Sequence, residues 1–257
     1  MTNEVEASLA QSFGEVLVRL AGERPGLLVV SGPDTSLVSW FTQIWPERLV
    51  TVAPAASRLS VGQGIRRGGG EAIVVLDETV SVLPSVMTAP MVLLSADRMH
   101  LGAAHRAGTT VCQPGWELDL PALLIGALGA DEPVVLHLPE PLPGLPEQPD
   151  PERTSFGDPR VLHRGRRGLV IGAGPTAPVA AWVARRLAGQ QVDVLALDSH
   201  TMGADSGVDT ELLADHPLVG PIDAPRAGAL DAVRVDPSDL HGLVNAVRRA
   251  LPGMARS

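Results

Sequence analysis

A pair of glycines between an apolar stretch and an alanine-rich stretch is the most motif-like feature of this sequence. In "GLVIGAGPTAPVAAWVARRL" (168–187), Gly172-Ala173-Gly174 ends a predicted strand and leads directly into a predicted helix. Such turns can cradle the pyrophosphate of a dinucleotide, and Asp198 closes the next predicted strand, where a ribose-binding acid belongs. The alternative is a tight turn that allows close helix–sheet packing, with Asp198 as a surface acid or a helix cap. We favour this alternative, because the surrounding unit is too short for two mononucleotide-binding halves.

Two histidines form a second candidate for chemistry. His100 and His105 lie in "SADRMHLGAAHRAG", a predicted loop that also contains Asp97. Imidazoles at this spacing beside a carboxylate could bind a metal or relay a proton. Histidines that are simply solvated in a loop are the alternative. His137 falls in a predicted strand, where a structural role is expected.

The composition excludes several kinds of chemistry. The sequence has no lysine, since all 20 basic residues are arginine, which excludes Schiff-base catalysis and a phosphate-binding loop with lysine. A net charge of −9 argues against nucleic acid or an anionic membrane as a partner. Cys112 is the single cysteine and is expected to be a small buried hydrophobe. No basic leader and no apolar run of about 20 residues is present, so a cytoplasmic protein is expected.

Predicted strands and helices alternate along the chain. Apolar residues at helical spacing indicate helices, and short β-branched runs between glycine, proline or polar residues indicate strands. A cap at Thr35 or Ser36 is expected for the second helix, and a break at Gly68 for the third. The predicted helices cover 6–24, 36–48, 56–67, 117–129, 176–188 and 238–251, and the predicted strands cover 26–32, 48–53, 71–77, 91–96, 109–114, 132–139, 168–174, 191–198 and 231–236.

A proline-rich stretch divides the chain. Residues 139–159 contain seven of the 23 prolines and read as a stiff, extended linker. Strands that alternate with helices on both sides of it indicate mostly parallel sheets. We therefore expect an α/β protein with two doubly wound, mostly parallel-sheet domains, over 1–140 and 161–257, joined by a linker at 141–160.

The order of segments resembles the C-terminal half of a transketolase, which is a pyrimidine-binding domain followed by a C-terminal domain. The stretch "LLVVSGPDTSLVSWFTQIWPERLVTVAPAASRLSVGQGIRRGGG" is similar to the family's strand, "aDL.pS" turn, helix, strand and "E..M...A.G.a..GG" helix. "TTVCQPGWELDLPALLIGALGADEPVVLHLP" is similar to its "P.d..e...a...a....gP..iRl" segment, and the chain from 161 on resembles the start of its C-terminal domain. Pyruvate dehydrogenase β-subunits share this plan, so transketolase-type and dehydrogenase-type chemistry both stay open.

The resemblance implies a split enzyme. In the family, thiamine diphosphate and Mg²⁺ lie between a diphosphate-binding domain and the pyrimidine-binding domain of another subunit. This sequence has no "GDG…N" segment, which holds Mg²⁺ and the diphosphate in the family. A separate N-terminal-half transketolase subunit would therefore hold most of the cofactor, in a heterodimer or heterotetramer that acts on a small ketose or keto acid. On this view His100 and His105 face substrate as catalytic residues, and Asp34, Thr35 and Ala55 lie at the cofactor.

One departure from the family concerns its acid–base chemistry. The family's glutamate, which drives the cofactor tautomer that deprotonates the thiazolium carbon, aligns with Ala55. The nearest acids along the sequence are Glu47 and Glu71, and the ring-stacking aromatic residue is missing after the third strand. Three hypotheses follow. They are a thiamine-diphosphate-dependent subunit with an atypical pocket, a catalytically silent scaffold or regulatory subunit, and an independent dinucleotide-binding protein.

Overall fold

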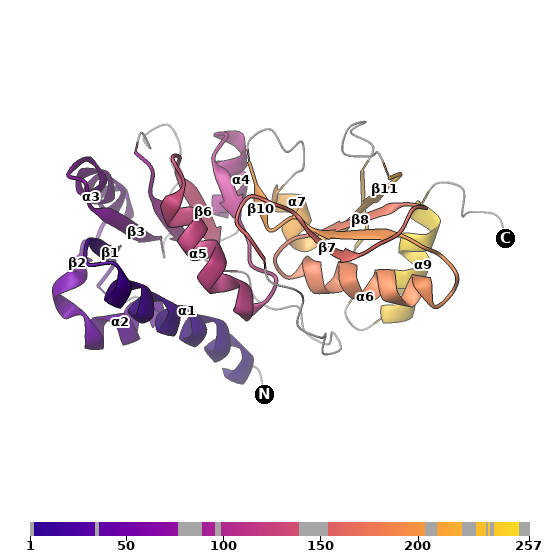
Figure 1. Ribbon diagram of the computed structural model, residues 1–257, viewed down its shortest axis with the longest axis horizontal. Helices are drawn as coiled ribbons and strands as arrows, with labels where there is room; N and C mark the ends of the chain where they lie inside the picture. Colours follow the sequence, from indigo (N-terminus) through magenta and orange to yellow (C-terminus); the bar gives the residue numbers. More distant parts are fainter. Residues whose placement is uncertain are drawn as a thin grey trace.

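The computed structural model describes residues 3–33, 36–76, 89–95, 99–138, 154–203, 210–222, 230–234, 236 and 239–251, and within these it leaves out the side chains of 3–11, 99, 105, 106, 210 and 211. Two sheets follow one another along the long axis of the molecule, each with helices packed against it (Figure 1). The predicted α/β class is confirmed.

The first sheet has seven strands in the order β10-β5-β6-β4-β3-β1-β2. Six of them run parallel, and β10 (Thr201–Met202) pairs antiparallel with β5 at one edge. Because β10 belongs to the second half of the chain, the two halves share this sheet. The parallel strands are β1 (Leu27–Ser31), β2 (Leu49–Thr51), β3 (Glu71–Leu76), β4 (Val92–Ser95), β5 (Thr110–Cys112) and β6 (Val134–His137).

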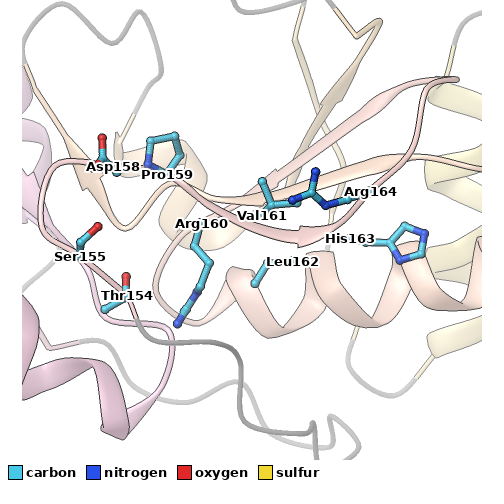
Figure 2. Close-up of a pocket in the computed structure, with 9 residues that line it drawn as sticks. All are labelled: Thr154, Ser155, Asp158, Pro159, Arg160, Val161, Leu162, His163 and Arg164. Carbon is cyan, nitrogen blue, oxygen red and sulfur yellow. The ribbon is translucent and has the colours of Figure 1, made fainter.

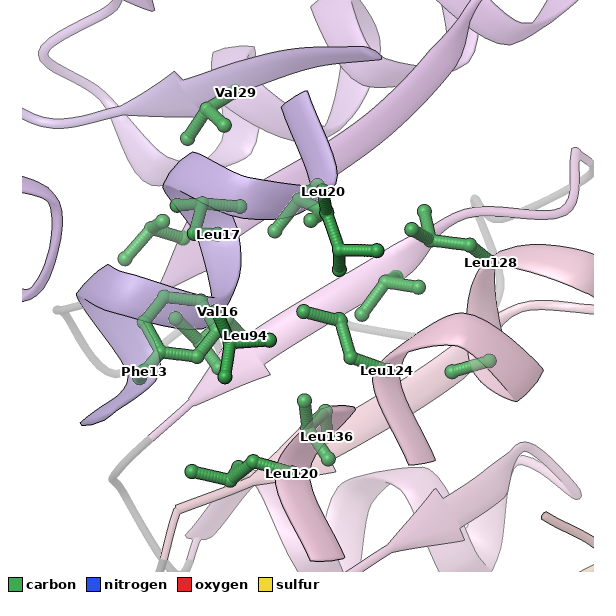
Figure 3. Packing of buried hydrophobic residues seen from close by; sticks show 14 of the residues in the cluster. Phe13, Val16, Leu17, Leu20, Val29, Leu94, Leu120, Leu124, Leu128 and Leu136 are labelled. Atoms are coloured by element: carbon green, nitrogen blue, oxygen red, sulfur yellow. The ribbon is translucent and has the colours of Figure 1, made fainter. Parts of the chain in front are cut away.

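Helices cover both faces of the first sheet. One face is packed by α1 (Asn3–Glu23), α2 (Ser39–Ile44) and α5 (Leu120–Gly129), whose leucines interlock over the strands in Figure 3. The other face is packed by α3 (Ala55–Arg67) and α4 (Met99–Arg106). Both faces of the central strands are buried, which explains why these strands read as continuous apolar runs rather than alternating ones. Three short 3-10 helices, η1 (Ser36–Val38), η2 (Pro46–Arg48) and η3 (Glu117–Asp119), complete this half.

The second sheet has five strands in the order β12-β11-β8-β9-β7. Only β8 (Leu169–Gly172) and β9 (Leu195–Asp198) pair in parallel, whereas β7 (Arg160–His163), β11 (Leu218–Gly220) and β12 (Asp231–Ala232) are joined antiparallel. Helices α6 (Thr176–Ala188) and α9 (Leu240–Ala250) pack on one face, and α7 (Thr210–Asp215) contributes to the core on the other.

Most predicted elements occur near their predicted positions, and helix 176–188 matches residue for residue. The second helix begins three residues late: η1 starts at Ser36, α2 follows Val38, and no side chain caps α2. Thr35 lies outside the described residues. Most of the predicted linker, 141–160, also lies outside them, so the domain boundaries stay predictions.

Two smaller expectations can be compared with the structure. Cys112 is fully buried in the apolar core, and burial raises the pKa of its thiol to about 12, so it is the inert small hydrophobe that was expected. None of the helices in the described parts of the chain has the length and apolar character needed to cross a membrane.

Candidate functional site

The predicted cofactor pocket lies at the carboxyl edge of the first sheet, where parallel α/β sheets commonly bind ligands. Ala55 is the first residue of α3, only 5% exposed, and it packs in an apolar cluster with Val30, Leu59 and Val74. Asp34 and Thr35 lie outside the described residues, so their predicted contacts with a cofactor stay predictions.

The two acids nearest to Ala55 along the sequence cannot replace the missing carboxylate. Glu71 begins β3 at the amino edge of the sheet and forms an ion pair with Arg24 at 2.5 Å. Glu47 lies in η2, just before β2, also at the amino edge. Both are a full strand length away from the carboxyl edge. The described residues around position 55 therefore do not fit a cofactor whose aminopyrimidine needs a carboxylate partner.

His100 lies in helix α4 and not in the predicted loop, which was wrong. Its side chain is fully buried, and Nδ1 lies 2.5 Å from the hydroxyl of Ser95, the last residue of β4. Ser95 is the register partner of His137 on β6, whose side chain is 1% exposed, as expected of a structural histidine. A catalytic role of His100 stays a prediction that its burial does not favour. His105 belongs to α4, and its side chain lies outside what the structure describes.

The turn Gly172-Ala173-Gly174 uses its backbone donors within the protein. The N–H of Ala173 donates to Oγ1 of Thr176, and the N–H of Gly174 donates to the carbonyl of Gln113, in the loop after β5. A Cβ on Gly172 would lie 2.3 Å from the carbonyl oxygen of Thr176, and Gly174 has φ +52°. The glycines therefore serve a tight turn that packs against the first half of the chain.

Asp198 is not a surface acid or a helix cap, and that expectation was wrong. Its carboxylate is fully buried and accepts a hydrogen bond from Arg160 at 2.6 Å. The other partner of Arg160 is Asp119, bound through both carboxylate oxygens at 2.8 Å each, and the guanidinium lies 4.6 Å from the ring centre of Trp116. We call Asp119, Arg160, Asp198 and His200 the junction cluster, because it joins the two halves of the chain.

His200 completes the junction cluster as a cation. Its Nδ1 lies 3.4 Å from Asp198, and its Nε2 lies 2.9 Å from the carbonyl oxygen of Ser155. With an acceptor at each ring nitrogen, only the doubly protonated imidazolium donates to both. Burial alone would lower the pKa of His200, but the hydrogen bond to Asp198, its charge and the Ser155 carbonyl outweigh burial, and the net shift is upward.

A polar hollow of about 650 Å³ borders β7 beside the junction cluster (Figure 2). Residues 154–155 and 158–164 line it. Figure 2 shows the Arg160 side chain directed to one side of the strand and Val161 to the other. Because the guanidinium of Arg160 is bound to two buried carboxylates, it is not available to an anionic ligand in this hollow. In the described parts of the chain, no three His, Cys, Asp or Glu side chains gather as metal ligands.

We expect no saturable binding of NAD, NADP or FAD to this chain, because the turn's donors and the Asp198 carboxylate are already engaged. Isothermal calorimetry on the wild-type protein measures this directly. Micromolar binding that disappears in an Asp198→Asn variant would contradict it. Because Asp198→Asn also weakens the junction cluster, its fold must first be checked by circular dichroism.

Sequence reasoning missed two arginines that organise these sites. Arg58 was treated as part of a helix and is fully buried, and Arg160 was placed at the end of the linker and starts β7. Arg58 could have been noticed, because the family pattern quoted above has an apolar methionine at its position. Arg160 carried no local signal, since its partners lie 41 and 38 residues away in the sequence.

Comparison with known proteins shows which fold this is. No protein-family model matches the sequence, and no curated protein matches it. Among solved structures, a protein described as "Split gene transketolase, inactive beta4 tetramer" is similar, with a TM-score of 0.72, 16% identity, and coverage of 96% of this chain and 98% of that one.

Two full-length transketolases are also similar. The one from Leishmania mexicana has a TM-score of 0.58 and 16% identity over 75% of this chain. A mutant from Pichia stipitis has a TM-score of 0.54 and 15% identity over 76% of this chain. The matches cover 34% and 35% of those two proteins, so this chain corresponds to about a third of their length. The chain therefore has the fold of the C-terminal half of a transketolase.

Proposed function

We propose that this chain is the C-terminal subunit of a two-component transketolase-like enzyme, which works with a separate N-terminal-half subunit. The observation that carries this proposal is the end-to-end match to a split-gene transketolase chain, over 96% of this chain and 98% of that one. The missing "GDG…N" segment supports it, because the groups that hold Mg²⁺ and diphosphate in the family must then come from another chain. The chain alone is inactive in this proposal.

The reaction proposed for the complex is the transfer of a two-carbon ketol unit from a small ketose or keto acid, with thiamine diphosphate and Mg²⁺ held mainly by the partner. The described residues of this chain contribute a rigid sheet edge and no carboxylate at position 55. A catalytically silent scaffold is the second candidate, and one observation favours it. The alanine in place of the family's glutamate is sealed in apolar packing rather than facing an open pocket.

The surface of α2 suits contact with a partner chain. Trp40 and Ile44 lie one helical turn apart and are 48% and 50% exposed, which is unusual for side chains of this size. Tryptophan in particular is enriched at the centres of protein interfaces. We propose that the N-terminal-half subunit covers this face of α2.

We expect the chain to form a stable complex with an N-terminal-half transketolase chain from the same genome, measured by co-expression and light scattering after gel filtration. A Trp40→Asp, Ile44→Asp variant should weaken this complex by about tenfold or more, because it puts two charges into an apolar interface. Ile222→Asp is the matched control, since Ile222 is 45% exposed but lies in the second half of the chain. Absence of any complex with wild type would refute the split-enzyme and scaffold hypotheses together.

A further inference from the structure

Arg58 is the largest side chain that is fully buried in this protein. It lies in the first turn of α3, and its guanidinium donates to three backbone carbonyl oxygens. These are Val52 at 2.9 Å, Ala53 at 3.0 Å and Val75 at 2.8 Å. An arginine in an apolar layer is costly unless its charge is met by good acceptors. Three carbonyls at short distance meet that requirement.

The three carbonyls belong to the carboxyl edge of the first sheet. Val75 is near the end of β3, and Val52 and Ala53 follow β2 and lead into α3. The guanidinium therefore bridges two strand ends at the edge where the ring of a cofactor is expected. It occupies their hydrogen-bonding capacity from the protein side.

Ala55 and Arg58 are neighbours on one face of α3. Residues three positions apart on a helix lie one above the other, and both of these are buried. The family pattern has glutamate and methionine at the two positions, and this chain has alanine and arginine. A buried negative charge is thus replaced by a buried positive charge one helical turn away. The two departures change the electrostatics of the pocket in the same direction.

We propose that Arg58 closes this subunit's half of the ring pocket to acid–base activation, and that positions 55 and 58 act as a pair. The inference rests on the proposed function. A fixed guanidinium disfavours a proton on a nearby ring nitrogen, because like charges raise the free energy of the protonated form. It would also bind a carboxylate introduced at position 55 in a charge-assisted hydrogen bond, which withholds that carboxylate from a ligand. Restoring the glutamate alone is therefore insufficient, and both positions must change.

The pair is first tested on the isolated chain, with no partner or cofactor. Urea unfolding of wild type, Ala55→Glu, Arg58→Met and the double variant forms a double-mutant cycle. We expect Ala55→Glu to cost less stability with Arg58 present than in the Arg58→Met background, by on the order of tenfold in the unfolding constant. Ala56→Glu is the matched control, because Ala56 is exposed on the same turn and should show no coupling. If Arg58→Met does not fold, Arg58→Gln supplies the second background. Absence of coupling in both backgrounds overturns the proposal.

The second test uses the complex with the N-terminal-half subunit and thiamine diphosphate with Mg²⁺. Hydrogen–deuterium exchange at the thiazolium C2, followed by NMR after acid quench, reports activation without turnover. We expect slow exchange in wild type and in Ala55→Glu, and exchange at least about tenfold faster in the Ala55→Glu, Arg58→Met complex. Equal acceleration by Ala55→Glu alone, or fast exchange in wild type, overturns the proposal. Failure to form any complex counts against the proposed function, whereas the unfolding cycle still decides whether the two positions are coupled.

Discussion

Replacing Arg160 with methionine is expected to lower the free energy of unfolding by roughly 3–5 kcal/mol, the cost typical of removing one partner of a buried ion pair. The side chain of Arg160 is 6% exposed, and its partners Asp119 and Asp198 are 3% and 0% exposed. The variant leaves two carboxylates buried without their cation. Burial already raises the pKa of Asp119 despite its bonds to Arg160, so the loss of Arg160 should raise it further. Urea unfolding at pH 7 measures the effect.

Two further variants show whether this cost comes from the unpaired charges. Arg164→Met changes an exposed arginine close behind on the same strand end and should alter stability by no more than about 0.5 kcal/mol. A triple variant, Arg160→Met with Asp119→Leu and Asp198→Leu, should recover part of the loss, because neither carboxylate then remains buried without its cation. A similar loss from Arg160→Met and Arg164→Met would contradict the role given to the junction cluster.

The elements with strong local patterns could be predicted from the sequence. Helix α6 was predicted at 176–188, because its alanines and valines recur at helical spacing directly after a glycine turn. The buried strands β1, β3 and β4 could be predicted because each is a short, β-branched or leucine-rich run with turn residues on both sides. Their local preference and their tertiary environment agree.

The short antiparallel strands could not be predicted, because their pairing is decided by distant partners. β10 and β12 have two residues each, too few to show any alternation. β10 pairs with β5 of the other half of the chain, and no local signal encodes such a pairing. α4 was taken for a loop because it is short and contains Gly102, yet Leu101 and Ala104 bury it against the first sheet.

The candidate site could be predicted only in part. The resemblance placed position 55 at the start of a helix at the carboxyl edge, and Ala55 is there. Arg58 and the junction cluster depend on which side chains become buried together, and charge alone does not tell a buried arginine from a solvated one. Asp198 shows the same limit. The sequence placed it correctly at the end of a strand but could not identify Arg160 as its partner.

The stability of the chain is expected to fall as pH rises above about 6.5, the ordinary pKa of histidine, because of His200. The pKa of His200 is raised in the folded protein, so the native state holds this proton more tightly than the unfolded chain does. The stabilisation is fully present below the unfolded pKa and is lost as pH rises through the folded one. Deprotonation leaves an unprotonated ring nitrogen facing either Asp198 or the carbonyl of Ser155, and the contact between 154–155 and β9 weakens.

Thermal unfolding of wild type and His200→Gln between pH 6 and 9 tests this effect. Glutamine can donate to one acceptor but carries no charge, so the variant should be less stable than wild type at pH 6 and approach it at pH 9. Asp119, whose pKa is raised from 3.8, also favours the protonated native state, but its titration begins in the acid range just above that value. Measurements at pH 6 and above therefore emphasise His200. Parallel pH profiles for wild type and His200→Gln would show that His200 is neutral in the fold, and that the junction cluster holds the two halves together through Arg160 alone.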